Sequence, residues 1–109
     1  PDIAREVCEK VLENEGSKGV LICGTGLGMQ MAASKIRGIR AALCTNEYMA
    51  EMARKHNDAN ILCLGERVVG DELAKNIVDK FFKTEFPGEE RHKRRVEKME
   101  TVSKELNDK

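Results

Sequence analysis

The chain has 109 residues, of which 40% are hydrophobic and 35% are charged, and its 19 basic and 19 acidic residues cancel to a formal net charge of zero. These values are typical of one soluble globular domain. The balanced charge argues against nucleic acid or a membrane surface as the partner, and no apolar run approaches the ~18 residues that a membrane span requires.

Four cysteines, at positions 8, 23, 44 and 63, contain no C-x-x-C pair and do not cluster with the two histidines. This spacing argues against a zinc site and a disulfide framework, and it favours the reducing cytoplasm. Cys8, Cys44 and Cys63 lie within apolar patterns and are predicted to be small core residues. Cys23 alone precedes a glycine-rich turn.

The first half of the chain predicts two helices and two strands. Apolar residues from Ile3 to Leu12 keep helical spacing, and Gly16 ends this helix. A strand over Val20–Cys23 runs into the glycine turn, and a helix is expected from about Met29 to Ile36. Gly38 closes that helix, and a second strand follows over Ile39–Cys44.

The second half continues the alternation. Thr45 or Asn46 can cap a helix over Glu47–Lys55, whose Met49, Met52 and Ala53 are expected to face inward. The remaining elements follow in chain order: a strand over Asn60–Leu64, a loop over Gly65–Gly70, an amphipathic helix from Asp71 to about Lys83, a break at Phe86–Gly88, and a final helix from about Glu89 to Leu106.

Strands that alternate with helices at this spacing predict an α/β domain with a parallel sheet covered by helices on both faces. Ligands bind such sheets at the carboxyl ends of the strands, where the turn after Cys23, Thr45–Asn46 and the Gly65–Gly70 loop emerge. Three strands make a thin sheet, and the chain starts at Pro1 without a methionine. We therefore expect residues 1–109 to be a single domain that lacks an N-terminal strand region.

The turn Gly24-Thr-Gly-Leu-Gly28 exposes backbone N–H groups beside the Cys23 thiol. The partial positive charges of these N–H groups should stabilise the thiolate and so ease ionisation of the thiol. A dinucleotide-binding G-x-G-x-x-G motif would need glycine at Met29, and the cysteine phosphatase loop would need arginine at that same position. The turn suits an oxyanion formed by removing a proton next to a carbonyl, with the thiolate as base.

Polar residues near other elements are further candidates. His56 follows the helix over Glu47–Lys55 and is interpreted either as a helix cap or as an acid–base group near the ligand-binding edge. Asn57 offers a donor and an acceptor to a hydroxylated ligand. Arg91 and Arg95 share a helix face and form either a phosphate-binding fork or a solvated basic face.

The last helix carries a narrow apolar stripe on an otherwise charged surface. Its members are Val96, Met99, Val102 and Leu106. A stripe this thin buries little against its own domain. We interpret residues 89–109 as an arm laid across a partner subunit, with a solvated, frayed tail as the alternative.

The chain resembles the type B ribose-5-phosphate isomerases, a family that includes the galactose-6-phosphate isomerase subunits. The resemblance extends over essentially all 109 residues and rests on five motifs in the family's order: Ile22–Gly28, Ala32–Lys35 with Gly38–Ala41, His56–Asn60, Gly65–Gly70 and Arg91–Arg95. It implies a Rossmann-like parallel sheet between helices, with a protruding C-terminal helix. It also implies a homodimer or tetramer with an active site shared between subunits, and no metal or organic cofactor.

The resemblance further implies interconversion of D-ribose 5-phosphate and D-ribulose 5-phosphate through an enediolate. Cys23 would be the base, and Thr25 and His56 would assist ring opening, with His56 as the proton donor. The other implied site residues are Gly24, Gly26, Leu27 and Gly28 as the backbone anion hole, Asn57 for sugar hydroxyls, and Arg67, Arg91 and Arg95 for the phosphate, the last two from the opposite subunit.

Three alternatives remain open from the sequence. The protein could isomerise a hexose 6-phosphate such as allose or galactose 6-phosphate, it could bind a sugar phosphate without turnover, or it could carry a phosphoryl group on Cys23. Family members begin with a strand that ends in an Asp-His pair, which this chain does not contain. If that region is absent from the protein, we expect little or no isomerase activity.

Overall fold

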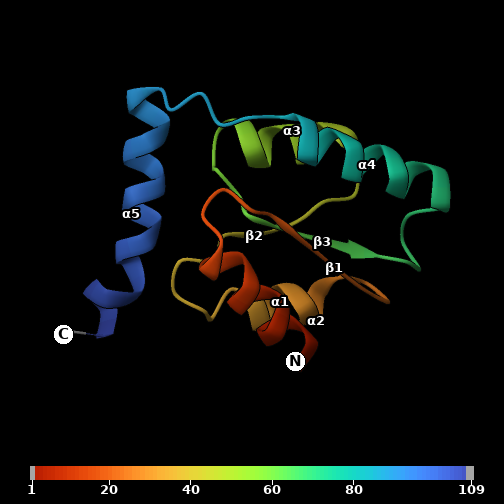
Figure 1. The fold of residues 1–109 in the computed structure, drawn as a ribbon, viewed down its shortest axis with the longest axis horizontal. Coiled ribbons are helices and arrows are strands. Elements are labelled where there is room, and N and C mark those ends of the chain that lie inside the picture. Colours follow the sequence, from red (N-terminus) through yellow and green to blue (C-terminus); the bar gives the residue numbers. More distant parts are fainter. Residues whose placement is uncertain (1, 108–109) are drawn as a thin grey trace.

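The computed structural model describes residues 2–107, and the side chains from residue 2 to residue 102. Its elements are, in chain order, α1 (Asp2–Glu13), β1 (Gly19–Cys23), α2 (Leu27–Ala33), β2 (Ala41–Leu43), α3 (Glu47–Lys55), β3 (Ile61–Gly65), α4 (Asp71–Lys83) and α5 (Glu90–Asn107) (Figure 1). The predicted type and order of every element are therefore confirmed for the described residues.

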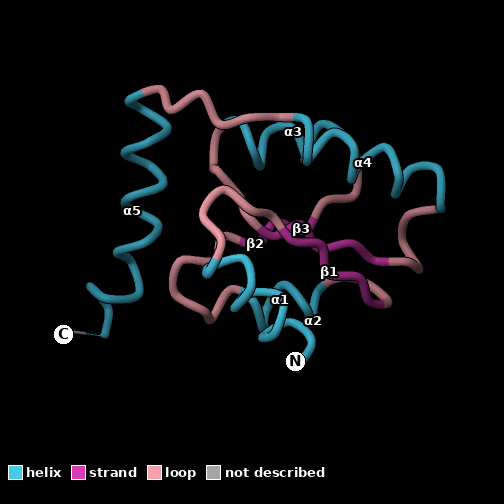
Figure 2. The backbone as a smooth tube through the Cα atoms, in the orientation of Figure 1, coloured by secondary structure: helices cyan, strands magenta, loops and turns pink. Residues whose placement is uncertain are grey.

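The three strands form a parallel sheet in the order β1-β3-β2. Gly19 of β1 and Ala41 of β2 both lie opposite Ile61 of β3, and Cys23 lies opposite Gly65. All five residues of the central strand β3 are buried, which explains its continuous apolar run. Figure 2 shows the strands between two layers of helices. The predicted α/β architecture is confirmed.

Each face of the sheet has its own core. Helices α1 and α2 cover one face, and α3 and α4 cover the other (Figure 1). Cys8 and Cys63 belong to the first core and Cys44 to the second, and all three side chains are buried. Their predicted core positions are confirmed, and all four cysteines of the chain are free.

Helix α2 begins earlier and ends earlier than the Met29–Ile36 prediction. Gly26 caps it in the left-handed conformation, with φ of 84°, so the helix starts at Leu27. The helix ends at Ala33, and Ile36 donates its N–H to the Ala33 carbonyl 3.0 Å away in a turn outside the helix. The glycine turn is therefore shorter than expected.

Strands β2 and β3 also differ from their predicted bounds. β2 covers only Ala41–Leu43, because Arg40 donates its backbone N–H to the side-chain Oδ1 of Asn60, 2.7 Å away, rather than to a strand neighbour. β3 runs from Ile61 to Gly65, one residue later than predicted. The shift leaves Asn60 free to bond at the entrance of the sheet.

Helix α3 has the predicted bounds but a different inward face. Asn46 is the cap, because its Oδ1 accepts the Met49 N–H at 2.8 Å. Ala50 and Ala53 are buried, whereas Met49 is 39% exposed. The prediction that Met49 faces inward is wrong. Its sulfur instead accepts a hydrogen bond from the Thr45 hydroxyl, 3.3 Å away at the surface.

Helix α5 stands apart from the two helix layers (Figure 1). Met99 and Val102 on its apolar stripe are 44% and 49% exposed, and Val96 is half-buried. The side chain of Leu106 lies outside the described residues. Among the described residues, no helix combines the length and apolar character that crossing a bilayer would require.

Candidate active site

Cys23 ends strand β1 with its thiol inside the glycine turn. Its side chain is half-buried, and the Gly26 N–H donates to Sγ at 3.1 Å. The pKa of Cys23 is lowered, chiefly by the backbone N–H of Met29. Partial burial opposes this shift, and the N–H groups of Gly26, Thr25 and Gly28 add to it. The turn therefore favours a thiolate at this position, as the sequence predicted.

Two glycines allow the turn to pack tightly on β3. A Cβ at Gly26 would lie 2.5 Å from Leu43 Cδ1 and 3.0 Å from the Leu64 carbonyl carbon. A Cβ at Gly65 would lie 2.5 Å from the Thr25 carbonyl carbon and oxygen. Neither position has space for a side chain, so the backbone donors around Cys23 are held in place by the sheet itself.

The loop after β3 completes this end of the sheet. The Glu66 N–H donates to the Cys23 carbonyl at 2.8 Å, and the Arg67 N–H donates to the Gly24 carbonyl at 2.9 Å. The Arg67 side chain passes Gly24, 3.5 Å from the place where a Cβ would stand. Thr25 is exposed beside it, and its hydroxyl accepts the Leu27 N–H at 3.3 Å. Cys23, Gly24–Gly28 and Arg67 form what we call the carboxyl-end group.

His56 lies at the other end of the sheet. It caps the C-terminus of α3, where its N–H donates to the Met52 carbonyl at 2.9 Å, and it precedes β3. Gly65, opposite Cys23, is at the far end of β3, about 13 Å along a strand of this length. The expectation that His56 lies near the Cys23 edge is wrong within one chain, because a helix between parallel strands returns the chain to their amino ends.

His92 is a residue that the sequence reasoning missed. Its ring stacks on His56 with centroids 4.2 Å apart and planes inclined by 11°. His92 is 5% exposed, and within the described residues its Nδ1 has no hydrogen-bond partner. Burial lowers its pKa, the charges of His56 and Arg91 lower it further, and Glu89 opposes the shift. The sequence did contain a feature that could have identified His92: it keeps helical spacing with Val96 and Met99 and so extends the apolar stripe by one turn.

Arg91 and Arg95 flank His92 on α5 and are exposed. The Arg91 Nε lies 3.6 Å from a Glu89 carboxylate oxygen. Asn57 lines a pocket of about 340 Å³ together with Met99 and Glu100 of α5. The structure therefore brings His56, Asn57, Arg91, His92 and Arg95 to the amino ends of the strands, and we call them the amino-end group.

In Figure 1, α5 stands on one side of the sheet and the arrowhead of β3 points to the other. The Cys23 thiol and its N–H donors belong to the carboxyl-end group, and His56 and the two arginines of α5 belong to the amino-end group. Within the described residues, no cluster of three or more histidine, cysteine, aspartate or glutamate side chains could hold a metal ion.

The family described as Ribose/Galactose Isomerase matches residues 1–99. Ribose-5-phosphate isomerase B of Escherichia coli is 45% identical over 107 residues, which cover 98% of this chain and 71% of that protein. A putative sugar phosphate isomerase of Bacillus subtilis is 48% identical over 99 residues, covering 91% of this chain and 66% of that protein. The chain thus spans about two thirds of the length of these relatives.

Solved structures agree with the sequence relatives. Ribose-5-phosphate isomerase B of Clostridium thermocellum superposes with a TM-score of 0.91 at 56% identity, covering 97% of this chain and 71% of that chain. The type B ribose 5-phosphate isomerase of Leishmania infantum gives a TM-score of 0.91 at 47% identity, covering 97% of this chain and 69% of that chain. Sequence and fold therefore lead to the same group of proteins.

Proposed function

The chain belongs to the Ribose/Galactose Isomerase family, and we propose that it interconverts D-ribose 5-phosphate and D-ribulose 5-phosphate, with Cys23 as the base. The observation that carries this proposal is the half-buried Cys23 thiol, whose pKa is lowered by a ring of backbone N–H groups. A thiolate beside convergent donors can remove a proton next to a carbonyl and hold the resulting oxyanion.

The reaction balances with protein groups alone. The Cys23 thiolate takes the proton from C2 of the open-chain aldose, the C2 electron pair forms the C1–C2 double bond, and the negative charge moves to the aldehyde oxygen. The N–H groups of residues 24–28 stabilise this enediolate. The hydroxyl proton then moves from O2 to the negatively charged O1, and return of the thiol proton to C1 forms the C2 carbonyl of the ketose and restores the thiolate.

Ring opening and phosphate binding use the remaining candidates. His56 protonates the ring oxygen, with Thr25 beside the thiol assisting proton transfer, and Asn57 binds sugar hydroxyls. Arg67, Arg91 and Arg95 bind the phosphate, since guanidinium groups are suited to phosphate oxygens. These roles follow from the family resemblance and from the chemistry of the side chains.

We infer that the complete site forms between two chains in a homodimer or a larger symmetric assembly. The carboxyl-end and amino-end groups lie at opposite ends of one sheet, so one chain alone does not bring Cys23 to His56. A symmetric pair places the carboxyl-end group of each chain against the amino-end group of the other. Exposed Leu27, Met31 and Val68 near the glycine turn support a covering subunit.

The base assignment is tested by Cys23→Ala, with Cys8→Ala as the control because Cys8 is a free cysteine in the core. Isomerisation is assayed with ribose 5-phosphate, allose 6-phosphate, galactose 6-phosphate and erythrulose 4-phosphate, the last because a 44% identical relative is a D-erythrulose-4-phosphate isomerase. We expect C23A to abolish turnover and keep sugar-phosphate binding. Normal turnover by C23A would refute the assignment of Cys23 as the base. If the wild type binds these sugar phosphates but isomerises none of them, the protein is a sugar-phosphate binding protein and not an isomerase.

The two-chain site is tested by subunit mixing. C23A and H56A chains are each expected to be inactive, and a mixed pair contains one site with intact Cys23 and intact His56. After the chains are unfolded and refolded together, random pairing restores about a quarter of the wild-type activity. A single-chain site would restore none, because every site would then carry one of the two substitutions.

A further inference from the structure

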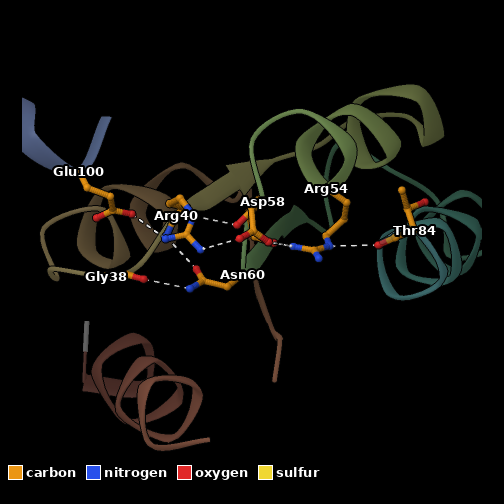
Figure 3. Close-up of polar contacts among 8 residues, drawn as sticks. Gly38, Arg40, Arg54, Asp58, Asn60, Thr84 and Glu100 are labelled. Carbon is orange, nitrogen blue, oxygen red and sulfur yellow. Dashed lines mark hydrogen bonds and ion pairs between the residues drawn. The ribbon is translucent and has the colours of Figure 1, made fainter. Parts of the chain in front are cut away.

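Arg40, just before β2, binds two acidic side chains from different parts of the fold (Figure 3). One guanidinium nitrogen donates to Glu100 Oε1 at 2.6 Å, and another contacts Asp58 Oδ2 at 3.3 Å. Its Nε donates to the Asp58 carbonyl at 2.8 Å. The side chain is 22% exposed, so these contacts are partly shielded from water.

Asp58 follows His56 and Asn57 directly and is held on both sides. Its φ of 48° makes it the only non-glycine residue with positive φ among the described residues. The buried Arg54 donates to Asp58 Oδ1 at 2.8 Å and to the Thr84 carbonyl at 3.1 Å. Arg40 and Arg54 together therefore fix the turn that carries the histidine and the asparagine.

Glu100 belongs to α5, and two side-chain interactions in the part of the chain that the structure describes join this helix to residues far before it in the sequence. His92 stacks on His56 near the start of the helix, and Glu100 pairs with Arg40 eight residues later, about 12 Å along the helix axis. Two points on one face determine the rotation of a helix as well as its place. That rotation sets the direction of Arg91 and Arg95, which lie on the neighbouring face.

We propose that Arg40 is a positioning residue: by binding Asp58 and Glu100 at once, it fixes the arginines of α5 relative to the His56–Asn57 turn. This inference rests on the proposed function, in which Arg91 and Arg95 bind the phosphate. Arg40 itself acts only through other residues. Lysine cannot replace it, because one ammonium group lacks the fork that reaches two carboxylates and a carbonyl together.

The test compares Glu100→Gln and Arg40→Lys with Glu97→Gln, an exposed α5 glutamate used as the matched control. For the sugar phosphate we expect KM to rise about threefold to tenfold in E100Q and in R40K, with kcat nearly unchanged. The double variant should show no larger rise in KM than R40K alone, because E100Q weakens a contact that R40K already weakens. E97Q should match the wild type.

Hydrogen exchange of the amides in residues 91–102 gives a readout that needs no substrate. We expect faster exchange in E100Q and R40K than in E97Q, with unchanged exchange in α4. Equal exchange in all variants, additive KM effects, or a loss confined to kcat would overturn the proposal. If the wild type turns over no sugar phosphate, the proposed function fails, and the exchange result still decides whether Arg40 holds the arm.

Discussion

The rings of His56 and His92 stack face to face, with centroids 4.2 Å apart and planes inclined by 11°. His56 is the C-cap residue of α3 and His92 lies in the first turn of α5, so the stack joins α5 to the end of a helix that covers the sheet. Two imidazolium ions in this arrangement would repel each other. The attachment of the arm should therefore depend on the protonation of His92.

Lowering the pH should weaken the stack between His56 and His92. Burial lowers the pKa of His92, so the unfolded chain binds more protons than the folded chain between the two pKa values, and stability rises with pH there. Above the ordinary histidine pKa of 6.5, the free energy of unfolding is not reduced by His92. As the pH falls below 6.5 toward the lower pKa of His92 in the folded chain, stability is lost. NMR titration of the two histidine rings should give His92 a lower midpoint in the folded chain than in urea.

A His92→Phe variant is the control for this acid effect, since phenylalanine can keep the stack without binding a proton. We expect the wild type to lose more thermal stability between pH 7.5 and pH 5.5 than H92F. An equal loss in both proteins, or a His92 midpoint above its value in urea, would contradict the prediction.

Cys23 should be the reactive cysteine. Its pKa is lowered by backbone N–H groups, whereas burial raises the pKa of Cys44 to about 11 and that of Cys63 to about 12. Iodoacetamide at pH 7 should therefore modify one site per folded chain, several times faster than it modifies that cysteine in urea. Peptide mass spectrometry identifies the site. Modification spread evenly over all four cysteines would show that the turn does not activate the thiol.

Gly65→Ala should damage the carboxyl-end group. The added Cβ would lie 2.5 Å from the Thr25 backbone, so the turn must move away from β3. We expect kcat/KM to fall at least tenfold, because the N–H donors then lose their alignment with the oxyanion. Gly70→Ala is the matched control, since nothing lies within 4 Å of its Cβ position. Equal activity of the two variants would mean that the close contact is unimportant.

Phe81 should carry much of the α4 core energy. It is fully buried, whereas its neighbour Phe82 is 44% exposed and packs edge-on against it. Phe81→Ala should lower the free energy of unfolding by about 3–5 kcal/mol, and Phe82→Ala by clearly less. Urea denaturation followed by circular dichroism measures both values. If both variants lost a similar free energy of unfolding, Phe82 would be as deeply packed as Phe81, which would contradict the structure.

The local chemistry of this chain was predictable from its sequence. Apolar periodicity located each helix and strand, since a helix or strand buries one face or one run. The apolar run into Gly24-Thr-Gly-Leu-Gly28 indicated the activated thiol, because backbone donors adjacent in sequence are also adjacent in space. The cysteines of the core followed from the same patterns.

Only the tertiary structure decided how the distant residues group. The sequence placed His56 near Cys23, but the parallel order β1-β3-β2 puts them at opposite ends of the sheet. The stack on His92 and the link from Arg40 to Glu100 join residues 36 and 60 positions apart. Such contacts have no local signature, because packing of whole elements, and not spacing along the chain, brings these side chains together.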